Sequence, residues 1–358
     1  MMNGNNISPD AKIYSGCRIE NSSIGPGCVI GAEGPVVIEN CQLGRNVKLK
    51  GGTFSGAVFL DGSSMGCGAH VRAGTILEEE ANGAHSVGLK QTVLLPFVTL
   101  GSLINFCDVL MAGGTSRKNH SEVGSSYIHF NFTPNQDKAT ASLVGDVSHG
   151  VLLNQKPIFL GGQGGLVGPA RIAYGSVIAA GGICRKDILE EGQLYVSPAP
   201  VGKSCPFKPG HYGNIDRIVK NNLIYIGNIN ALKAWYQNVR VFFVRDEFDQ
   251  ACLDGALANL NLILNERIQR LEKLAKTFPY IGKMILEIAK HLVAPDLSSE
   301  CGGEASFDRV ASSALMAEVE AADKTDYIVA VQNLGVGASA GATSWLQGVV
   351  NEIINLWR

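Results

Sequence analysis

The sequence predicts a mainly β chain: a parallel β-helix of hexapeptide repeats followed by an α-helical C-terminal region. Apolar residues recur every six positions, small or turn-forming residues follow them, and the period becomes helical from about residue 215. A helix would place apolar residues every three or four positions and an exposed strand every two, so a period of six indicates a repeat array. The period is clearest at Leu160, Leu166, Ile172, Ile178 and Cys184.

Each six-residue unit is expected to form a short strand and a tight corner. The spacing also occurs earlier in the chain, at Ile7, Ile13 and Ile19 and at Met65, Val71 and Leu77. Corner residues such as Gly25-Pro26-Gly27 follow the aliphatic positions, and these residue types favour turns. Three such units close a triangular coil, and stacked coils bury an aliphatic ladder that no single coil can bury alone.

Composition excludes several classes of protein. Among 358 residues, 30 Lys and Arg stand against 32 Asp and Glu, a balance that gives no basic field for nucleic acid or an anionic membrane. The opening segment lacks the basic and apolar regions of a secretory signal, and no apolar run has the length of a membrane span. The nine cysteines form no CxxC pair, so buried reduced thiols and a cytoplasmic location are expected.

The repeats divide the chain into two expected domains. The β-helix is predicted over residues 1–205, with loop excursions over about 78–143, where the period breaks down. Proline-rich segments end the coils near residue 205, and helical apolar stripes follow in the expected α-helical region of residues 206–358. Within it, the glycine-rich stretch from Gly335 to Gly341 lacks the context of a phosphate loop and is interpreted as a linker.

The irregular stretch gathers residues that could carry chemistry. Arg117-Lys118-Asn119-His120 places two cations beside a histidine, and His129, Asn131 and Lys138 follow. Val144-Gly145-Asp146 then opens the next regular unit. Long excursions from a regular scaffold are frequent sites of function.

These residues and the hexad period resemble the hexapeptide-repeat acyltransferases. Within them, the stretch resembles the acetyltransferase half of the bacterial bifunctional N-acetylglucosamine-1-phosphate uridyltransferase/glucosamine-1-phosphate acetyltransferases. In that family a histidine element precedes an Asn-Tyr pair, a Lys and an aliphatic-Gly-Asp triplet, and Asn131, Lys138 and Asp146 can be laid on that order. Phe132 stands where the family has Tyr, the residue before His120 is Asn119 rather than Gly, and the distance from His120 to Asn131 is shorter. The resemblance implies a left-handed β-helix, a homotrimer and acetyl-CoA as the acyl donor.

The resemblance also implies roles for residues. His120 would take the proton of an amino-sugar amine, because an ammonium is not nucleophilic and a neutral imidazole can accept its proton. Arg117, Lys118 and Lys138 would bind the phosphate of a sugar phosphate or nucleotide sugar, and Asn131 the sugar. The coenzyme A site is expected at Ala179, Ala180, Arg185 and Lys186.

Several alternatives stay open at this stage. His129 competes with His120 as the base, because alternation along a strand places His129 and Asn131 on one side, where both could face a cleft. A zinc hydratase on the same scaffold needs two histidines five residues apart, and no pair has that spacing, so no metal is expected. The rival function is non-catalytic: a nucleotide-sugar or sugar-phosphate binding or scaffold protein related to sugar-nucleotide pyrophosphorylases.

Overall fold

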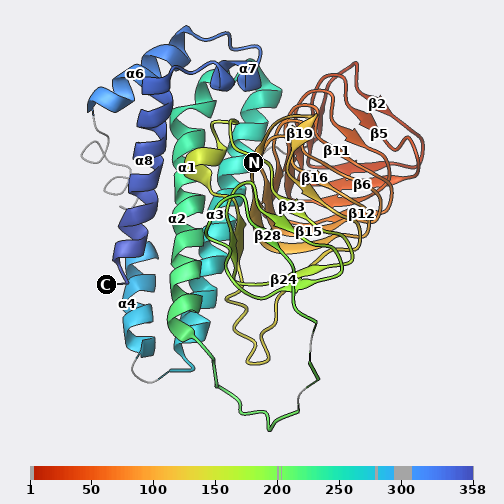
Figure 1. Cartoon of the computed structure of the whole chain (residues 1–358). Coiled ribbons are helices and arrows are strands. Elements are labelled where there is room, and N and C mark those ends of the chain that lie inside the picture. Colours follow the sequence, from red (N-terminus) through yellow and green to blue (C-terminus); the bar gives the residue numbers. More distant parts are fainter. Residues whose placement is uncertain (1–3, 200, 203, 279–280, 294–308, 358) are drawn as a thin grey trace.

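The computed structural model describes residues 4–199, 201–202, 204–278, 281–293 and 309–357. It shows a parallel β-solenoid of about 11 turns with helices in the C-terminal region, which confirms the predicted fold class. The coils stack along one axis, and the helices lie along one side of the stack (Figure 1).

One face of the solenoid is a parallel sheet of ten short strands, one from each of ten coils. In stacking order these are β2 (Lys12–Ile13), β5 (Val29–Ile30), β8 (Lys48–Leu49), β11 (Ser64–Met65), β14 (Asn82–Gly83), β16 (Thr99–Leu100), β20 (Glu122–Val123), β23 (Phe159–Leu160), β26 (Val177–Ile178) and β28 (Leu194–Tyr195). We call this the first face.

The other two faces form one sheet of 16 strands, because β15 and β17 run across the corner between them. The second face has β3 (Arg18–Glu20), β6 (Val36–Glu39), β9 (Gly52–Ser55), β12 (Ala69–Val71), the start of β15 (Gly88–Leu94) and of β17 (Asn105–Met111), β21 (Ile128–Phe130), β24 (Gly165–Val167) and β27 (Ile183–Cys184). The third face has β1 (Asn6–Ile7), β4 (Ser23–Ile24), β7 (Gln42–Leu43), β10 (Ala57–Phe59), β13 (Thr75–Leu77), the ends of β15 and β17, β22 (Ser142–Val144) and β25 (Arg171–Ile172).

The core is a set of aliphatic ladders, as the six-residue period predicts. On the first face the second residue of each strand from β5 to β26 points inward and pairs with the same position of the next coil. This ladder comprises Ile30, Leu49, Met65, Gly83, Leu100, Val123, Leu160 and Ile178. Gly83 replaces an aliphatic residue because the Met65 side chain occupies the space: a Cβ at Gly83 would lie 2.9 Å from the Met65 methyl carbon.

The regular coils continue further than predicted, and three excursions then leave the corners. Strands β13 to β17 keep the coils in register through Met111, so the excursions do not begin near Glu78. The first excursion, residues 112–121, holds the hairpin β18 (Gly114–Ser116) and β19 (Asn119–His120). The second spans 131–141, and the third, 145–158, holds α1 (Val147–Gly150).

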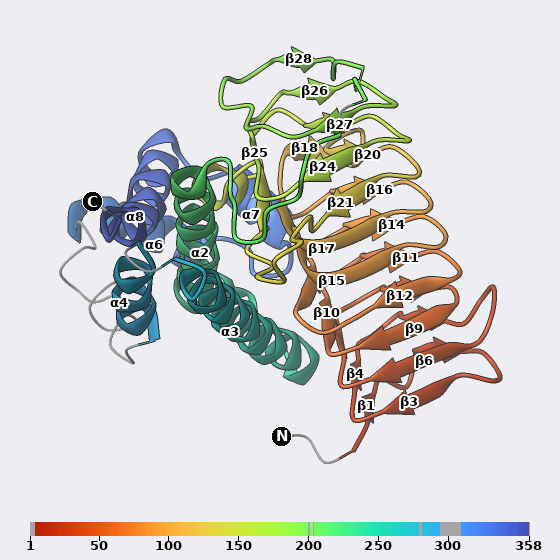
Figure 2. The same ribbon diagram turned by 90° about the horizontal axis from the view of Figure 1, so that it is seen from below.

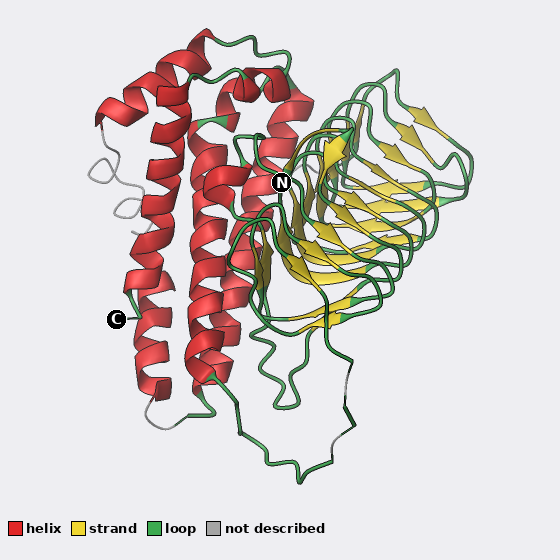
Figure 3. Cartoon of the chain, viewed as in Figure 1, coloured by secondary structure: helices red, strands yellow, loops and turns green. Residues whose placement is uncertain are grey.

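The helices cover the third face of the solenoid. They are α2 (Ile215–Asn238), the short 3-10 helix η1 (Arg240–Phe243), α3 (Glu247–Ala275), α4 (Ile281–Val293), α6 (Arg309–Ala321), α7 (Tyr327–Gln332) and α8 (Val336–Asn355). Helix α3 contacts β4, β7, β10 and β13, and α2 contacts β22. Figure 2 shows α2 and α3 beside this face, and Figure 3 shows the separation of helices from strands.

Close packing within the helical region corrects one expectation. The stretch from Gly335 to Gly341 is not a linker, since Gly335 is the N-cap of α8 and the following residues form its first turns. Helices α2 and α8 pack tightly, and a Cβ at Gly227 would lie only 3.1 Å from the Val350 Cα.

Ion pairs join the helices to the solenoid. Arg245 Nη2 lies 2.7 Å from Asp61 Oδ2, and Arg267 Nη2 lies 2.9 Å from Asp108 Oδ1. Arg267 is buried, so its pair with Asp108 is a desolvated contact. In the part of the chain described above, no helix is both long and apolar enough to cross a membrane.

Candidate functional site

The hairpin of the first excursion carries three of the predicted site residues: Arg117, Lys118 and His120. Gly114 permits its tight closure, because its backbone has φ of +105° and a Cβ there would lie 2.6 Å from the His120 Cα. The Arg117 Nη1 donates hydrogen bonds to the Phe97 carbonyl (2.8 Å) and the Thr99 hydroxyl (3.0 Å). Arg117 therefore fastens the hairpin to the coils below it.

His120 is held in one orientation. Its Nδ1 lies 2.9 Å from the Arg117 carbonyl oxygen. A carbonyl only accepts hydrogen bonds, so the neutral tautomer that fits this contact has its proton on Nδ1 and its lone pair on Nε2. Nε2 lies 3.9 Å from Glu122 Oε2, and the side chain is 19% exposed. The arrangement provides an oriented, reachable proton acceptor.

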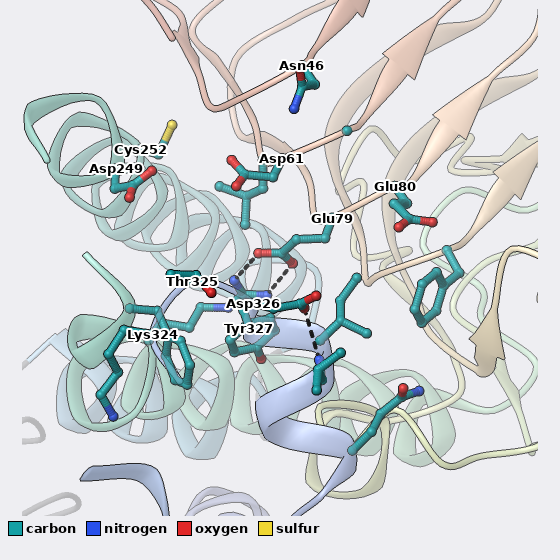
Figure 4. A pocket seen from close by; sticks show the side chains of 18 of the residues that line it. Asn46, Asp61, Glu79, Glu80, Asp249, Cys252, Lys324, Thr325, Asp326 and Tyr327 are labelled. Carbon is teal, nitrogen blue, oxygen red and sulfur yellow. Dashed lines mark hydrogen bonds and ion pairs between the residues drawn. The ribbon is translucent and has the colours of Figure 1, made fainter. Parts of the chain in front are cut away.

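A cavity of about 680 Å³ lies beside this hairpin, between the solenoid and the helical region. We call it the junction cavity. Its wall includes Thr115, Ser116, Arg117 and Lys118 from the hairpin. Coil residues, η1, the start of α3 and the segment from Lys324 to Gln332 complete the wall. Figure 4 shows several of these side chains from close by.

A buried network of charges forms part of the cavity wall. Arg240 Nη1 lies 2.7 Å from Glu79 Oε1, and its Nη2 lies 2.7 Å from Glu78 Oε2. The Tyr236 hydroxyl donates to Glu78 Oε1 at 2.8 Å. Two carboxylates thus share one guanidinium. Burial and the negative charge of Glu79 raise the pKa of Glu78 by more than the positive charge of Arg240 lowers it, and the pKa reaches about 7.

Other predicted site residues lie at a different corner. His129, Asn131 and Lys138 belong to β21 and the second excursion, between the second and third faces, whereas the hairpin stands between the third face and the first. Within one chain, the hairpin residues and the group of His129, Asn131 and Lys138 therefore lie at different corners of the solenoid.

His129 points into the solenoid and does not face a cleft. It is 5% exposed and pairs with Leu166 of the next coil. Its Nε2 lies 2.8 Å from the Ser142 Oγ. Burial lowers the pKa of His129 to about 4, so the imidazole stays neutral in the interior. This environment is typical of a structural histidine.

Asn131 and Lys138 hold the second excursion in place. The Asn131 amide donates to Asp108 Oδ2 at 3.3 Å and accepts from the Thr140 hydroxyl at 2.9 Å. The Lys138 carbonyl accepts a long hydrogen bond from Arg267, while the side chain is exposed. Both polar ends of Asn131 are therefore engaged within the protein.

The residues predicted to bind coenzyme A occupy two corners. Ala179 and Ala180 follow β26 at one corner, and Arg185 and Lys186 follow β27 at the next. Lys186 Nζ lies 4.9 Å from the centre of the Tyr195 ring. Both cations are exposed.

Sequence reasoning missed a histidine and carboxylate pair in the third excursion. His149 Nδ1 lies 2.8 Å from Asp146 Oδ1, and this hydrogen bond raises the pKa of His149. The signal was present, because Asp146 and His149 are three residues apart at the start of a helix. Sequence reasoning also missed Arg240, Tyr327 and Lys324 of the junction cavity. The run Glu78-Glu79-Glu80 was a clue, since consecutive carboxylates on a packed coil need cations.

The described residues contain no cluster of three or more His, Cys, Asp or Glu side chains that could hold a metal ion. The residues gathered here can transfer a proton through an imidazole and bind a ligand through cations, carboxylates and aromatic rings.

Comparison with known proteins supports the sequence-based prediction. The bifunctional protein GlmU of Thermotoga maritima is 27% identical over 183 residues, which are 51% of this chain and 37% of that protein. GlmU of Nitratidesulfovibrio vulgaris is 28% identical over 191 residues, 51% of this chain and 38% of that protein. The resemblance to the hexapeptide-repeat acyltransferases is confirmed. The chain spans less than half the length of these relatives.

Similar solved structures also carry acyltransferase names. The Arabidopsis UDP-N-acetylglucosamine acyltransferase is 13% identical, with a TM-score of 0.25, over 81% of this chain and 98% of that chain. The Bacteroides fragilis LpxA, a UDP-N-acetylglucosamine acyltransferase, is 12% identical, with a TM-score of 0.25, over 71% of this chain and 95% of that chain. No protein-family model matches the sequence.

Proposed function

We propose that this chain is an acyltransferase that acetylates the amine of an amino-sugar phosphate or a nucleotide amino sugar, with acetyl-CoA as donor. The observation that carries the proposal is the geometry of His120, whose Nδ1 is bonded to the Arg117 carbonyl at 2.9 Å. Sequence similarity to GlmU over about half of the chain supports the reaction class.

In the proposed reaction the lone pair of His120 Nε2 removes a proton from the acceptor ammonium. The amine nitrogen then attacks the thioester carbonyl, and a tetrahedral oxyanion forms. As this intermediate collapses, the carbon–sulfur bond breaks and the coenzyme A thiolate leaves. The imidazolium returns its proton to the sulfur and the nitrogen releases its second proton to water, so the histidine is restored and the products are an amide, free coenzyme A and one proton.

We also propose that copies of the chain associate, as a homotrimer, along the first face. Three outward residues there, Phe159, Val177 and Leu194, form an apolar ladder in register and are 39%, 38% and 68% exposed. Glu122, which lies near His120, pairs with Phe159 at the end of this ladder. A second copy on the ladder would bring its own residues toward His120.

The experiment measures acetyl-CoA consumption with a panel of amino-sugar phosphates and nucleotide amino sugars. It compares the wild-type protein with His120→Ala and His129→Ala. Loss of turnover in His120→Ala, with the variant folded by circular dichroism, supports the proposal. Loss only in His129→Ala transfers the role of base to His129. No turnover of any amine by the wild-type protein favours the non-catalytic binding or scaffold function.

The oligomeric state is tested separately by light scattering, with Phe159→Asp as the disrupting variant. A trimer that dissociates in this variant supports association along the first face. A monomeric wild-type protein contradicts it.

A further inference from the structure

The junction cavity has charges that the protein itself does not neutralise. Arg245 is paired with Asp61 and Asp249, and Arg240 is paired with Glu79. Within the described chain, no carboxylate pairs with Lys118 or Lys324, which line the wall from two segments, one on the hairpin and one before α7. These ammonium groups are available to an anionic ligand.

Lys324 is held in place without losing its charge. Its Nζ lies 5.3 Å from the centre of the Phe243 ring and donates to the Val319 carbonyl. An aromatic ring and a carbonyl orient an ammonium but do not neutralise it. Lys118, by contrast, is exposed at the tip of the hairpin.

One carboxylate in the cavity wall lacks a partner. Among the described residues, nothing pairs with the Glu80 carboxylate, and this group can accept hydrogen bonds from hydroxyl or ammonium groups. The Arg240 Nε also has no hydrogen-bond partner, but this atom is itself buried and lies out of reach of a ligand in the cavity.

The rest of the wall provides apolar surface. Phe97, Phe243 and Tyr327 line the cavity and are 3%, 8% and 8% exposed. Arg240 stacks on the Tyr327 ring, with its guanidinium carbon 3.9 Å from the ring centre. These buried rings make part of the wall apolar, and the cavity volume of about 680 Å³ is in the range for a small ligand.

We infer that the junction cavity binds a phosphorylated sugar. Lys118 and Lys324 bind the phosphate, and Glu80 binds the hydroxyl or amine groups of the sugar. The inference deepens the proposed function and rests on it for the identity of the ligand. His120 is not among the residues that line the cavity, and its hairpin borders the cavity through Thr115, Ser116, Arg117 and Lys118. It gives the helical region a role in substrate binding, since Lys324, Arg240 and Tyr327 all come from that region.

The test is isothermal titration calorimetry of the full chain with glucosamine 1-phosphate, glucose 1-phosphate and inorganic phosphate. The variants are Lys118→Ala, Lys324→Ala and the conservative Lys118→Arg. Lys220→Ala is the matched control, because Lys220 is exposed on α2 and does not line the cavity. Loss of one ammonium–phosphate contact weakens binding about tenfold or more.

Saturable binding of both sugar phosphates, weakened about tenfold or more by Lys118→Ala and by Lys324→Ala but not by Lys220→Ala, supports the inference. Tighter binding of glucosamine 1-phosphate than of glucose 1-phosphate, abolished by Glu80→Gln, places the amine at Glu80. Absence of saturable binding, or equal binding by all variants, overturns the inference. If Lys118→Ala weakens binding and Lys324→Ala does not, the proposed contact between the ligand and the helical region is overturned.

The two proposals can fail separately. If the sugar phosphate binds in the cavity but no amine is acetylated, the proposed reaction is wrong and the proposed binding site still holds. If acetyl transfer occurs and its KM is unchanged in Lys118→Ala and Lys324→Ala, the cavity does not bind the substrate of the reaction. The acyltransferase proposal then still holds.

Discussion

The guanidinium of Arg240 donates two hydrogen bonds to the carboxylate of Glu79, at 2.7 and 3.0 Å, and so joins the helical region to a coil 161 residues earlier in the chain. Glu78 binds the same guanidinium from the neighbouring position, at 2.7 Å. This contact closes one wall of the junction cavity. The helical region is therefore part of the candidate site as well as a cover for the third face.

Removal of Arg240 is expected to destabilise the protein strongly. Arg240→Ala leaves Glu78 and Glu79 buried without their cation, and the free energy of unfolding should fall by about 3–5 kcal/mol. Chemical denaturation monitored by circular dichroism measures the change. A triple variant that adds Glu78→Gln and Glu79→Gln should recover part of the loss. A change below about 1 kcal/mol would show that the pair is not buried in solution.

The stability of the protein should depend on pH through Glu78. Its pKa is raised to about 7 in the folded protein, above the value of about 4.3 expected in the unfolded chain. The folded state thus binds the proton more tightly, so this contribution is complete below about pH 4 and is lost as the pH rises through 7. Denaturation curves from pH 5 to pH 8 should show wild-type stability falling relative to Glu78→Gln. Parallel curves would contradict the raised pKa.

The aliphatic ladder predicts unequal effects of two adjacent substitutions on β8. Leu49 is fully buried, and Leu49→Ala should cost about 2–5 kcal/mol of unfolding free energy. Lys48 points outward on the same strand, and Lys48→Ala should change stability by less than about 0.5 kcal/mol. Thermal and chemical denaturation compare the two variants. Similar costs at both positions would be inconsistent with a ladder at this coil.

Asp146 should control the titration of His149. The hydrogen bond and the charge of Asp146 raise the pKa of His149, so Asp146→Asn should shift the pKa downward. NMR titration of the imidazole protons measures the shift directly, with His85 as an internal comparison outside the third excursion. An unchanged His149 titration would mean that the pair does not form in solution.

The coils were predictable because their interactions are local. Each aliphatic position meets the same position one coil later, and small corner residues recur with it, so a short stretch of sequence contains the whole pattern. The hairpin residues Arg117, Lys118 and His120 were singled out for a related reason, because they interrupt this pattern, and their role stays a prediction. The predicted start of the excursions near Glu78 was wrong, because the chain from Glu78 to Met111 keeps the geometry of the coils. Fewer of its corners contain glycine, so the period is harder to recognise there.

The junction cavity was not predictable from the same signals. Arg240, Arg245 and Lys324 reach it only through the packing of helices on the third face, and no local period encodes that packing. His129 was misplaced for a different reason. Strand alternation correctly places it on one side of β21, but alternation does not show that this side faces the core. Gly335 and Gly341 were misread because glycine favours loops on average, whereas here Gly335 is the N-cap of α8 and Gly341 is buried within that helix.

Steady-state transfer of acetyl groups from acetyl-CoA to the preferred amine, with wild type and His120→Gln measured side by side, tests the central claim most directly. We predict saturable transfer by the wild-type protein and a fall in kcat of about 10²–10⁴ in the variant, because the amine then lacks its proton acceptor. Equal rates for the two proteins, or no transfer by the wild type, would contradict the account.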